Sequence, residues 1–205
     1  MTATTRRSLL RSIGVAGLWG LGAAVVPVSL LARPKAAEAI GGTLPTVGEP
    51  APDFDLEGVA PAEGKAGNTT AVRRSLADFG GQWLVLYFYP RDFTGGCTLE
   101  ARGFQRDLAE FQSLNTAIVG ISADRPDKHS SFCESEGLAF ALLSDPDGRV
   151  SKQYGSWIPP FSQRHTFLID PDGVLREQWV GVRPSGHSQE VLDGVKRQQS
   201  LVTTS

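Results

Sequence analysis

The sequence has few of the residues that bind metals or nucleic acids. Its three histidines, His129, His165 and His187, show no metal-ligand spacing and are interpreted as surface or packing residues. Two Asp-Pro-Asp-Gly turns, at residues 145–148 and 170–173, lack the remaining acidic ligands of a calcium loop. The chain also has no basic block with interleaved aromatic residues to attract a phosphate backbone. The sequence therefore predicts no bound metal, no cofactor and no nucleic-acid partner.

Cysteine is also scarce, since Cys97 and Cys133 are the only two in the chain. In an exported protein, two cysteines suggest by default one structural disulfide. A packed residue or a reactive thiol is the alternative for each of them. The sequence around each cysteine has to decide between these interpretations.

The first 39 residues have the pattern of an export signal and not of a globular segment. Arg6 and Arg7 precede an apolar run at residues 13–32, as in twin-arginine signals. Ala37 and Ala39 form an A-x-A site, which predicts cleavage after Ala39. An uncleaved membrane anchor is the alternative, because the run nearly reaches the ~20 residues that span a bilayer. No cysteine directly follows the run, which excludes a lipoprotein anchor.

The remaining residues, 40–205, have the length of one domain with one sizeable core. The whole chain has a net charge of −2, and removal of the leader, with its five basic residues and one acidic residue, leaves −6. Cleavage of the leader predicts a mature protein in the periplasm or the thylakoid lumen, with membrane contact only during export.

Strand and helix patterns alternate along residues 40–205, which predicts an α/β sheet with helices on both faces. The run WLVLYFY at residues 83–89 is too apolar for a half-exposed strand and predicts a buried central one. Residues 57–68 are small and polar, and we expect a surface loop there. Further strands are expected at residues 54–56, 117–122, 139–143, 166–169 and 174–180, and helices at residues 98–113, 126–136, 149–154 and 188–198.

Cys97 follows Gly95 and Gly96, between the predicted central strand and the helix expected at residues 98–113. It should occupy the first helical turn, where free N–H groups and the helix dipole stabilise an anion by about 0.3–1 kcal/mol. An ordinary cysteine thiol has a pKa of about 8.5, and one pKa unit corresponds to about 1.36 kcal/mol. Because the helix alone supplies too little stabilisation for a thiolate at neutral pH, we expect a nearby cation.

Pro90, Thr94 and Cys97 form the P-x-x-x-T-x-x-C signature of the peroxiredoxins. The surrounding VLYFYPRDFTGGCTLEARGF is similar to the peroxiredoxin Q branch, also called the bacterioferritin comigratory protein family. The resemblance extends from about Gly48 to the end of the chain, through VGISAD, GLAFALLSDPDG, YGSW and RHTFLIDPDG. It implies a thioredoxin-like α/β fold with a central mixed sheet, a monomer and no cofactor. It also implies that the protein is a peroxidase that reduces hydrogen peroxide and organic hydroperoxides. A thioredoxin-like thiol donor would then reduce the oxidised enzyme.

The resemblance also implies roles for individual residues. Cys97 would be the peroxidatic cysteine, and Thr94 would orient both its thiolate and the peroxide. Arg164, which opens the RHTFLID segment, would be the active-site cation. Arginine suits this role because it stays charged and donates in a planar fork. Pro90 would shield the pocket, and Glu100 matches the acid that usually positions the arginine.

Many members of this branch carry a resolving cysteine five residues after the first, where this chain has Arg102. A subset places it on the next helix, and the spacing of Cys133 from Cys97 is similar to theirs. Cys133 would then condense with the sulfenic acid of Cys97 to form an intramolecular disulfide. Because bridged Cα atoms lie within about 7 Å of each other, we expect both helical segments to unwind locally.

Other interpretations stay open. Cys133 could be an ordinary buried residue, with an external thiol resolving Cys97 in a one-cysteine peroxidase. The two cysteines could instead form a permanent structural disulfide, or a non-enzymatic redox-sensing switch. A thiol–disulfide oxidoreductase of the same fold would need C-x-x-C, and the residue at the second position is Glu100.

Overall fold

The computed structural model describes residues 38–39, 41–62 and 65–203, which belong to the compact unit Pro34–Ser205. The predicted export signal lies outside these residues, apart from its last two, Glu38 and Ala39. These two form strand β1 (Glu38–Ala39), which pairs antiparallel with β2 (Gly42–Thr43). None of the helices in the described ranges combines the length and the apolar character that crossing a bilayer requires.

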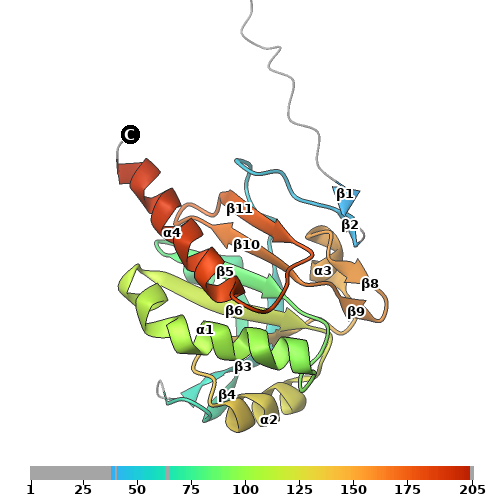
Figure 1. Cartoon of the computed structure of the whole chain (residues 1–205). Helices are drawn as coiled ribbons and strands as arrows, with labels where there is room; N and C mark the ends of the chain where they lie inside the picture. Colours follow the sequence, from blue (N-terminus) through green and yellow to red (C-terminus); the bar gives the residue numbers. More distant parts are fainter. Residues whose placement is uncertain (1–37, 40, 63–64, 204–205) are drawn as a thin grey trace, which may run out of the picture. The chain divides into compact units, whose positions relative to one another are not determined.

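A seven-stranded mixed sheet lies at the centre of this unit (Figure 1). β5 pairs with β6, and β6 with β7, in the parallel sense that helical crossovers allow. β10 pairs antiparallel with β5 and β11, and β3 pairs antiparallel with β7 and β4. The mixed α/β sheet predicted from the sequence is therefore confirmed. Across the sheet, the strands are β11 (Leu175–Val180), β10 (His165–Ile169), β5 (Trp83–Phe88), β6 (Thr116–Ser122), β7 (Ala141–Ser144), β3 (Asp55–Pro61) and β4 (Thr69–Ser75).

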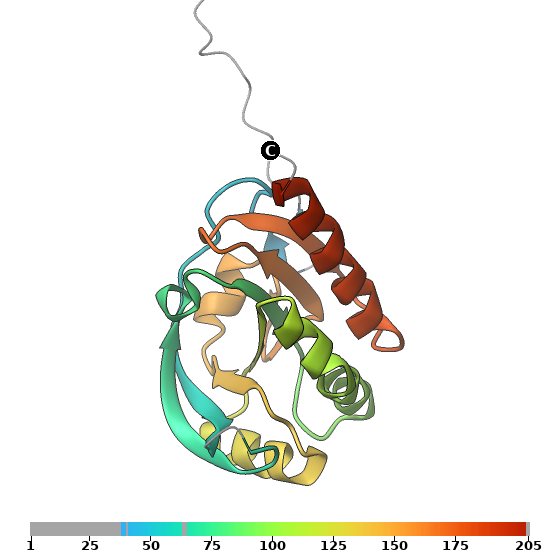
Figure 2. The same cartoon turned by 90° about the vertical axis from the view of Figure 1, so that its left-hand side faces the viewer.

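Helices cover both faces of the sheet, as the sequence predicts (Figures 1 and 2). The long helices α1 and α4 run side by side on one face and share a hydrophobic core with α2. The short helix α3 packs in a second core on the opposite face. The helices are α1 (Gly95–Ser113), α2 (Pro126–Glu136), α3 (Arg149–Gln153) and α4 (His187–Thr203), and a 3₁₀ helix, η2 (Leu76–Phe79), precedes β5.

β5 lies between the two cores and is buried along its whole length. Its side chains alternate, so that Tyr87 belongs to the core of α1, α2 and α4, and Phe88 to the core of α3. A strand covered on both faces needs apolar residues at every position, which explains the WLVLYF sequence. This rigid strand carries the chain to the loop that precedes Cys97.

The expected surface loop at residues 57–68 is wrong, because β3 continues to Pro61. β3 pairs along its length with β4, a strand that the sequence did not indicate. β4 is the last strand of the sheet, and all of its residues are exposed or half-buried, so it lacks an apolar alternation. A small hairpin, formed by β8 (Trp157–Ile158) and β9 (Phe161–Ser162), also lies in the segment before Arg164.

Candidate active site

Cys97 is the third residue of α1, directly after the loop that leaves β5. Thr94 is the N-cap residue, with φ −88° and ψ 143°, and its carbonyl oxygen accepts the N–H of Thr98. The Cys97 side chain is buried, with only 1 % of its surface exposed. Its sulfur therefore lies at the positive end of a 19-residue helix, where burial strengthens the field of the free N–H groups.

Arg164 directly precedes β10, whose pairing with β5 sets His165 opposite Phe88. This pairing carries Arg164 to the edge of the sheet where α1 begins. Its Nη2 donates a hydrogen bond to the sulfur of Cys97, with 3.2 Å between the two atoms. Gly96 leaves the room for this contact, because a Cβ at that position would lie 2.6 Å from Nη2. The structure therefore places the guanidinium of Arg164, the expected cation, in contact with the sulfur of Cys97, the expected nucleophile.

Glu100 lies one turn after Cys97 on α1 and is 1 % exposed. Its Oε2 lies 3.6 Å from Nε of Arg164. Neither carboxyl oxygen has a hydrogen-bond partner within the described part of the chain. Burial raises the pKa of Glu100 to about 8, and the positive charge of Arg164 only partly offsets this effect. The carboxyl group is therefore mostly neutral near pH 7.

Thr94 and Pro90 lie in the loop between β5 and α1, and both are half-buried. The Thr94 hydroxyl donates to the carbonyl oxygen of Arg91, at 3.0 Å. Because a hydroxyl has one proton, donation to a bound peroxide requires this group to turn away from Arg91. Pro90 follows Tyr89 directly, at the point where the chain leaves the sheet.

Cys133 lies on α2, fully buried, in the same core as Cys97, and both cysteines carry free thiols. Burial, with a smaller effect of Asp92, raises the pKa of the Cys133 thiol to about 12. The Tyr87 hydroxyl is also buried, without a hydrogen-bond partner among the described residues. Burial raises the pKa of Tyr87 well above its usual value, and negative charge on Glu100, Cys133, Asp92 or Cys97 adds to the shift. Because its pKa is raised this far, the Cys133 thiol is protonated near neutral pH, and it lies inside the core.

Comparison with known proteins identifies the family. The model of the AhpC/TSA family matches residues 47–178, which is more than half of the chain. The chain belongs to the AhpC/TSA family. Peroxiredoxin Bcp of Bacillus subtilis is 35% identical over 158 residues, which cover 73% of this chain and 94% of that protein. The crystal structure of a cysteine-to-serine mutant of Xylella fastidiosa PrxQ matches with a TM-score of 0.67 and 31% identity, over 77% of this chain and 99% of that one.

A solved structure of the Xanthomonas campestris bacterioferritin comigratory protein also matches, with a TM-score of 0.59 and 32% identity. The match covers 70% of this chain and 91% of that one, and the work on that protein concerns its alkyl peroxide reduction activity. Together these relatives support membership of the Bcp and PrxQ branch. This AhpC/TSA family member is therefore an enzyme of the peroxiredoxin type with a thioredoxin-like fold.

Glu100→Gln should flatten the pH dependence of stability in this AhpC/TSA family member. The folded pKa of about 8 lies above the ordinary value of 4.5, so the unfolded chain releases this proton first as the pH rises. Wild-type stability should therefore fall relative to the variant between these two values, by on the order of a few kcal/mol. Urea unfolding of both reduced proteins at pH 5 and pH 8 measures the difference. An equal change in the free energy of unfolding between pH 5 and pH 8 in the two proteins would show that Glu100 titrates normally.

A buried polar cluster that the sequence did not predict lies beside α2. It consists of Tyr89, Asp92 and His129, and His129 lies one helical turn before Cys133. The four-residue spacing of His129 and Cys133 was the available signal, because it places both on one helix face. All three histidines of the chain are buried and bonded to other side chains or to the backbone. Among the described residues, no group of three or more metal-binding side chains occurs.

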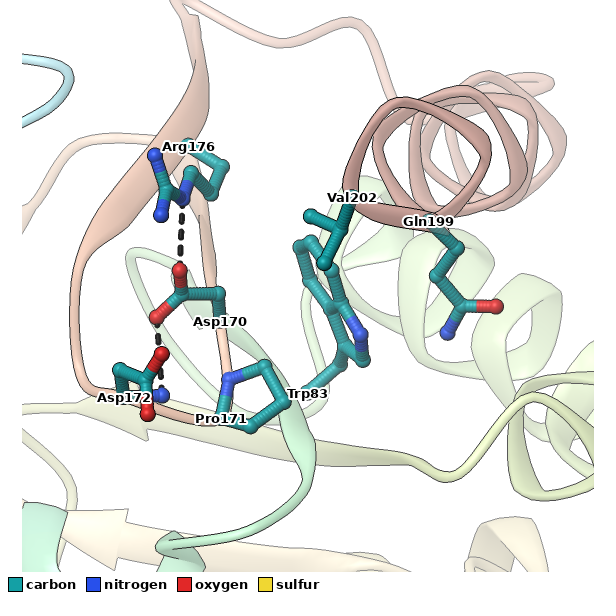
Figure 3. A pocket seen from close by; sticks show the side chains of 7 residues that line it. All are labelled: Trp83, Asp170, Pro171, Asp172, Arg176, Gln199 and Val202. Carbon is teal, nitrogen blue, oxygen red and sulfur yellow. Dashed lines mark hydrogen bonds and ion pairs between the residues drawn. The ribbon is translucent and has the colours of Figure 1, made fainter. Parts of the chain in front are cut away.

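A pocket of about 420 Å³ lies at the other end of β5, away from Cys97 (Figure 3). Trp83, the first residue of β5, forms part of its wall. Arg176 and Asp170 also line it, but Arg176 donates to Asp170 at 2.6 Å, so their charges are paired with each other. None of the candidate active-site residues lines this pocket, which is therefore a separate feature.

Proposed function

We propose that this family member is a two-cysteine peroxidase, with Cys97 as the peroxidatic and Cys133 as the resolving cysteine. The observation that carries the proposal is the 3.2 Å contact between Arg164 Nη2 and the Cys97 sulfur. This contact lies at the N-terminus of α1, so a guanidinium and the free N–H groups of a helix favour the same anion.

In the first step, the Cys97 thiolate attacks one oxygen of the peroxide in line with the O–O bond. The O–O bond breaks, Cys97 becomes a sulfenic acid, and the departing oxygen takes up the proton that the thiol has lost. Arg164 and the N–H groups of the first turn stabilise the negative charge that develops on this oxygen. Glu100, mostly neutral near pH 7, leaves the charge of Arg164 available for this task.

In the second step, the Cys133 thiol attacks the sulfur of the sulfenic acid, a disulfide forms and water leaves. A thioredoxin-like dithiol then reduces the disulfide and becomes oxidised itself. Two free thiols in one core cluster support this step. The alkyl peroxide reduction activity of the Xanthomonas campestris relative supports organic hydroperoxides as substrates beside hydrogen peroxide.

Cys133→Ser should stop the reaction at the sulfenic acid of Cys97. After one equivalent of hydrogen peroxide, intact mass should show that the wild type loses two hydrogens, whereas the variant gains one oxygen. Turnover with a thioredoxin-like donor should fall by at least about tenfold, because the donor then lacks its disulfide substrate.

The matched control is Ser131→Ala, an exposed position two residues earlier on α2, which should keep the wild-type cycle. A sulfenic acid in both wild type and Cys133→Ser, with equal turnover, would indicate a one-cysteine peroxidase. That outcome would overturn the resolving role of Cys133 while leaving the role of Cys97 in place.

A further inference from the structure

The Asp92 cluster, formed by Tyr89, Asp92 and His129, joins the loop before Cys97 to helix α2. Asp92 Oδ2 lies 2.8 Å from Nδ1 of His129, and Asp92 Oδ1 accepts the hydroxyl of Tyr89, also at 2.8 Å. Asp92 is 1 % exposed and His129 is fully buried. A hydrogen-bonded carboxylate and imidazole in such surroundings hold each other more strongly than they would in water.

The same loop has two further attachments near α2. The N–H of Asp92 donates to Oδ2 of Asp124, just before α2, at 2.7 Å. The ring of Phe93 packs edge-on against Phe132 of α2, with 5.1 Å between the ring centres. Phe93 has a φ of 61°, a left-handed conformation that bulky residues rarely adopt, so its neighbours must hold it there. Two consecutive loop residues, Asp92 and Phe93, therefore contact α2 or the segment just before it.

These attachments connect the two segments that carry the thiols. On one side the loop continues through Thr94 into α1, with Cys97 at its third residue. On the other side, His129 precedes Cys133 by four residues on α2, so both lie on the same buried face. A disulfide requires the two Cα atoms to approach within about 7 Å with matched Cβ directions. Unwinding of α2 that extends from Cys133 back to His129 would break the contact between Asp92 and His129.

We infer that Asp92 and His129 are positioning residues that keep Cys133 away from oxidised Cys97 and so limit the rate of disulfide formation. The inference rests on the two-cysteine function proposed above. It adds that the Asp92 cluster sets the lifetime of the sulfenic acid. During this lifetime a second peroxide can convert the Cys97 sulfenic acid to a sulfinic acid, with release of water. Weaker contacts within the Asp92 cluster should therefore favour formation of the disulfide over formation of the sulfinic acid.

The test uses Tyr89→Phe, which removes one hydrogen bond to Asp92 and keeps the ring, and His129→Leu, which removes the partner on α2. The matched control is His187→Leu on α4, since His187 is also buried and contacts two side chains, Thr166 and Glu190. Rapid-quench intact mass after a pulse of peroxide follows peroxide reduction, disulfide formation and sulfinic acid in one experiment.

Tyr89→Phe should speed disulfide formation about fivefold, the effect of one lost hydrogen bond, and His129→Leu should exceed this. Peroxide reduction should stay within about twofold of the wild type in both, because the contacts of Cys97 with Arg164 remain. Half-conversion to sulfinic acid should need correspondingly more peroxide. His187→Leu should change none of these rates, although it removes a buried histidine of the same kind.

A second readout needs no peroxide. In a Cys97→Ser background Cys133 is the only thiol, and its rate of alkylation under native conditions reports the opening of α2. Tyr89→Phe should raise this rate about fivefold as well. Should His129→Leu fail to fold, Tyr89→Phe decides the question on its own.

The outcomes separate the inference from the function on which it rests. A wild type that forms no disulfide after peroxide would overturn the two-cysteine function itself. A wild type that forms the disulfide, with Tyr89→Phe and His129→Leu equally fast or slower, would overturn only the role assigned to the Asp92 cluster. Slower variants would mean that Asp92 and His129 assist the attack of Cys133.

Discussion

Cys97→Ser should abolish peroxidase turnover in this AhpC/TSA family member, with a loss of at least about 10⁴-fold. A serine hydroxyl keeps its proton near neutral pH, so neither Arg164 at 3.2 Å nor the first turn of α1 can turn it into an effective nucleophile. The variant differs by one atom, and the buried site should otherwise stay intact. Peroxide consumption with excess dithiol, at several peroxide concentrations, measures the loss.

Thr98→Ser is a suitable control, because Thr98 is the next residue of the same turn and is half-buried. It should keep turnover within about twofold of the wild type. If Cys97→Ser kept turnover within about tenfold of the wild type, the nucleophile would have to be Cys133, and the roles proposed for the two cysteines would be wrong.

The elements that the sequence predicts well are those that packing alone determines. β5 is apolar at all positions because both faces are covered, and no other element fits such a pattern next to glycines and a proline. β4 escaped prediction because its stability comes from backbone pairing with β3 at the edge of the sheet. Such pairing produces no alternation of apolar and polar side chains, so the sequence of β4 did not indicate a strand.

The candidate site shows the same division. Cys97 and its helix position follow from local sequence, but Arg164 lies 67 positions away and could be assigned only through the resemblance. Antiparallel pairing of β10 with β5 explains why that distant arginine reaches the sulfur. The link between Asp92 and His129 could not be predicted, because it depends on how α2 docks against the loop before α1.

Arg164→Lys should lower the rate constant for peroxide reduction by about 10²–10³-fold, a loss typical of removing one donor to a developing negative charge. Lysine keeps the positive charge but lacks the planar fork, which here reaches the Cys97 sulfur through Nη2 and faces Glu100 through Nε. Stopped-flow kinetics of the first oxidation measure the effect without the later steps. Arg106→Lys is the control, because Arg106 lies on α1 and binds Asp107 through both Nε and Nη2.

Gly96→Ala tests the same contact without changing the arginine. The new Cβ would lie 2.6 Å from Nη2 and 3.1 Å from Cζ of Arg164, so the guanidinium has to move away from the sulfur. Gly95→Ala is its control, because a Cβ at Gly95 meets no atom within 4 Å. If the position of the guanidinium determines the rate constant for peroxide reduction, Gly96→Ala should show a large part of the decrease expected for Arg164→Lys. Gly95→Ala should show little decrease. If Gly96→Ala and Arg164→Lys both react as fast as the wild type, the helix N-terminus alone activates Cys97, and Arg164 has a structural role.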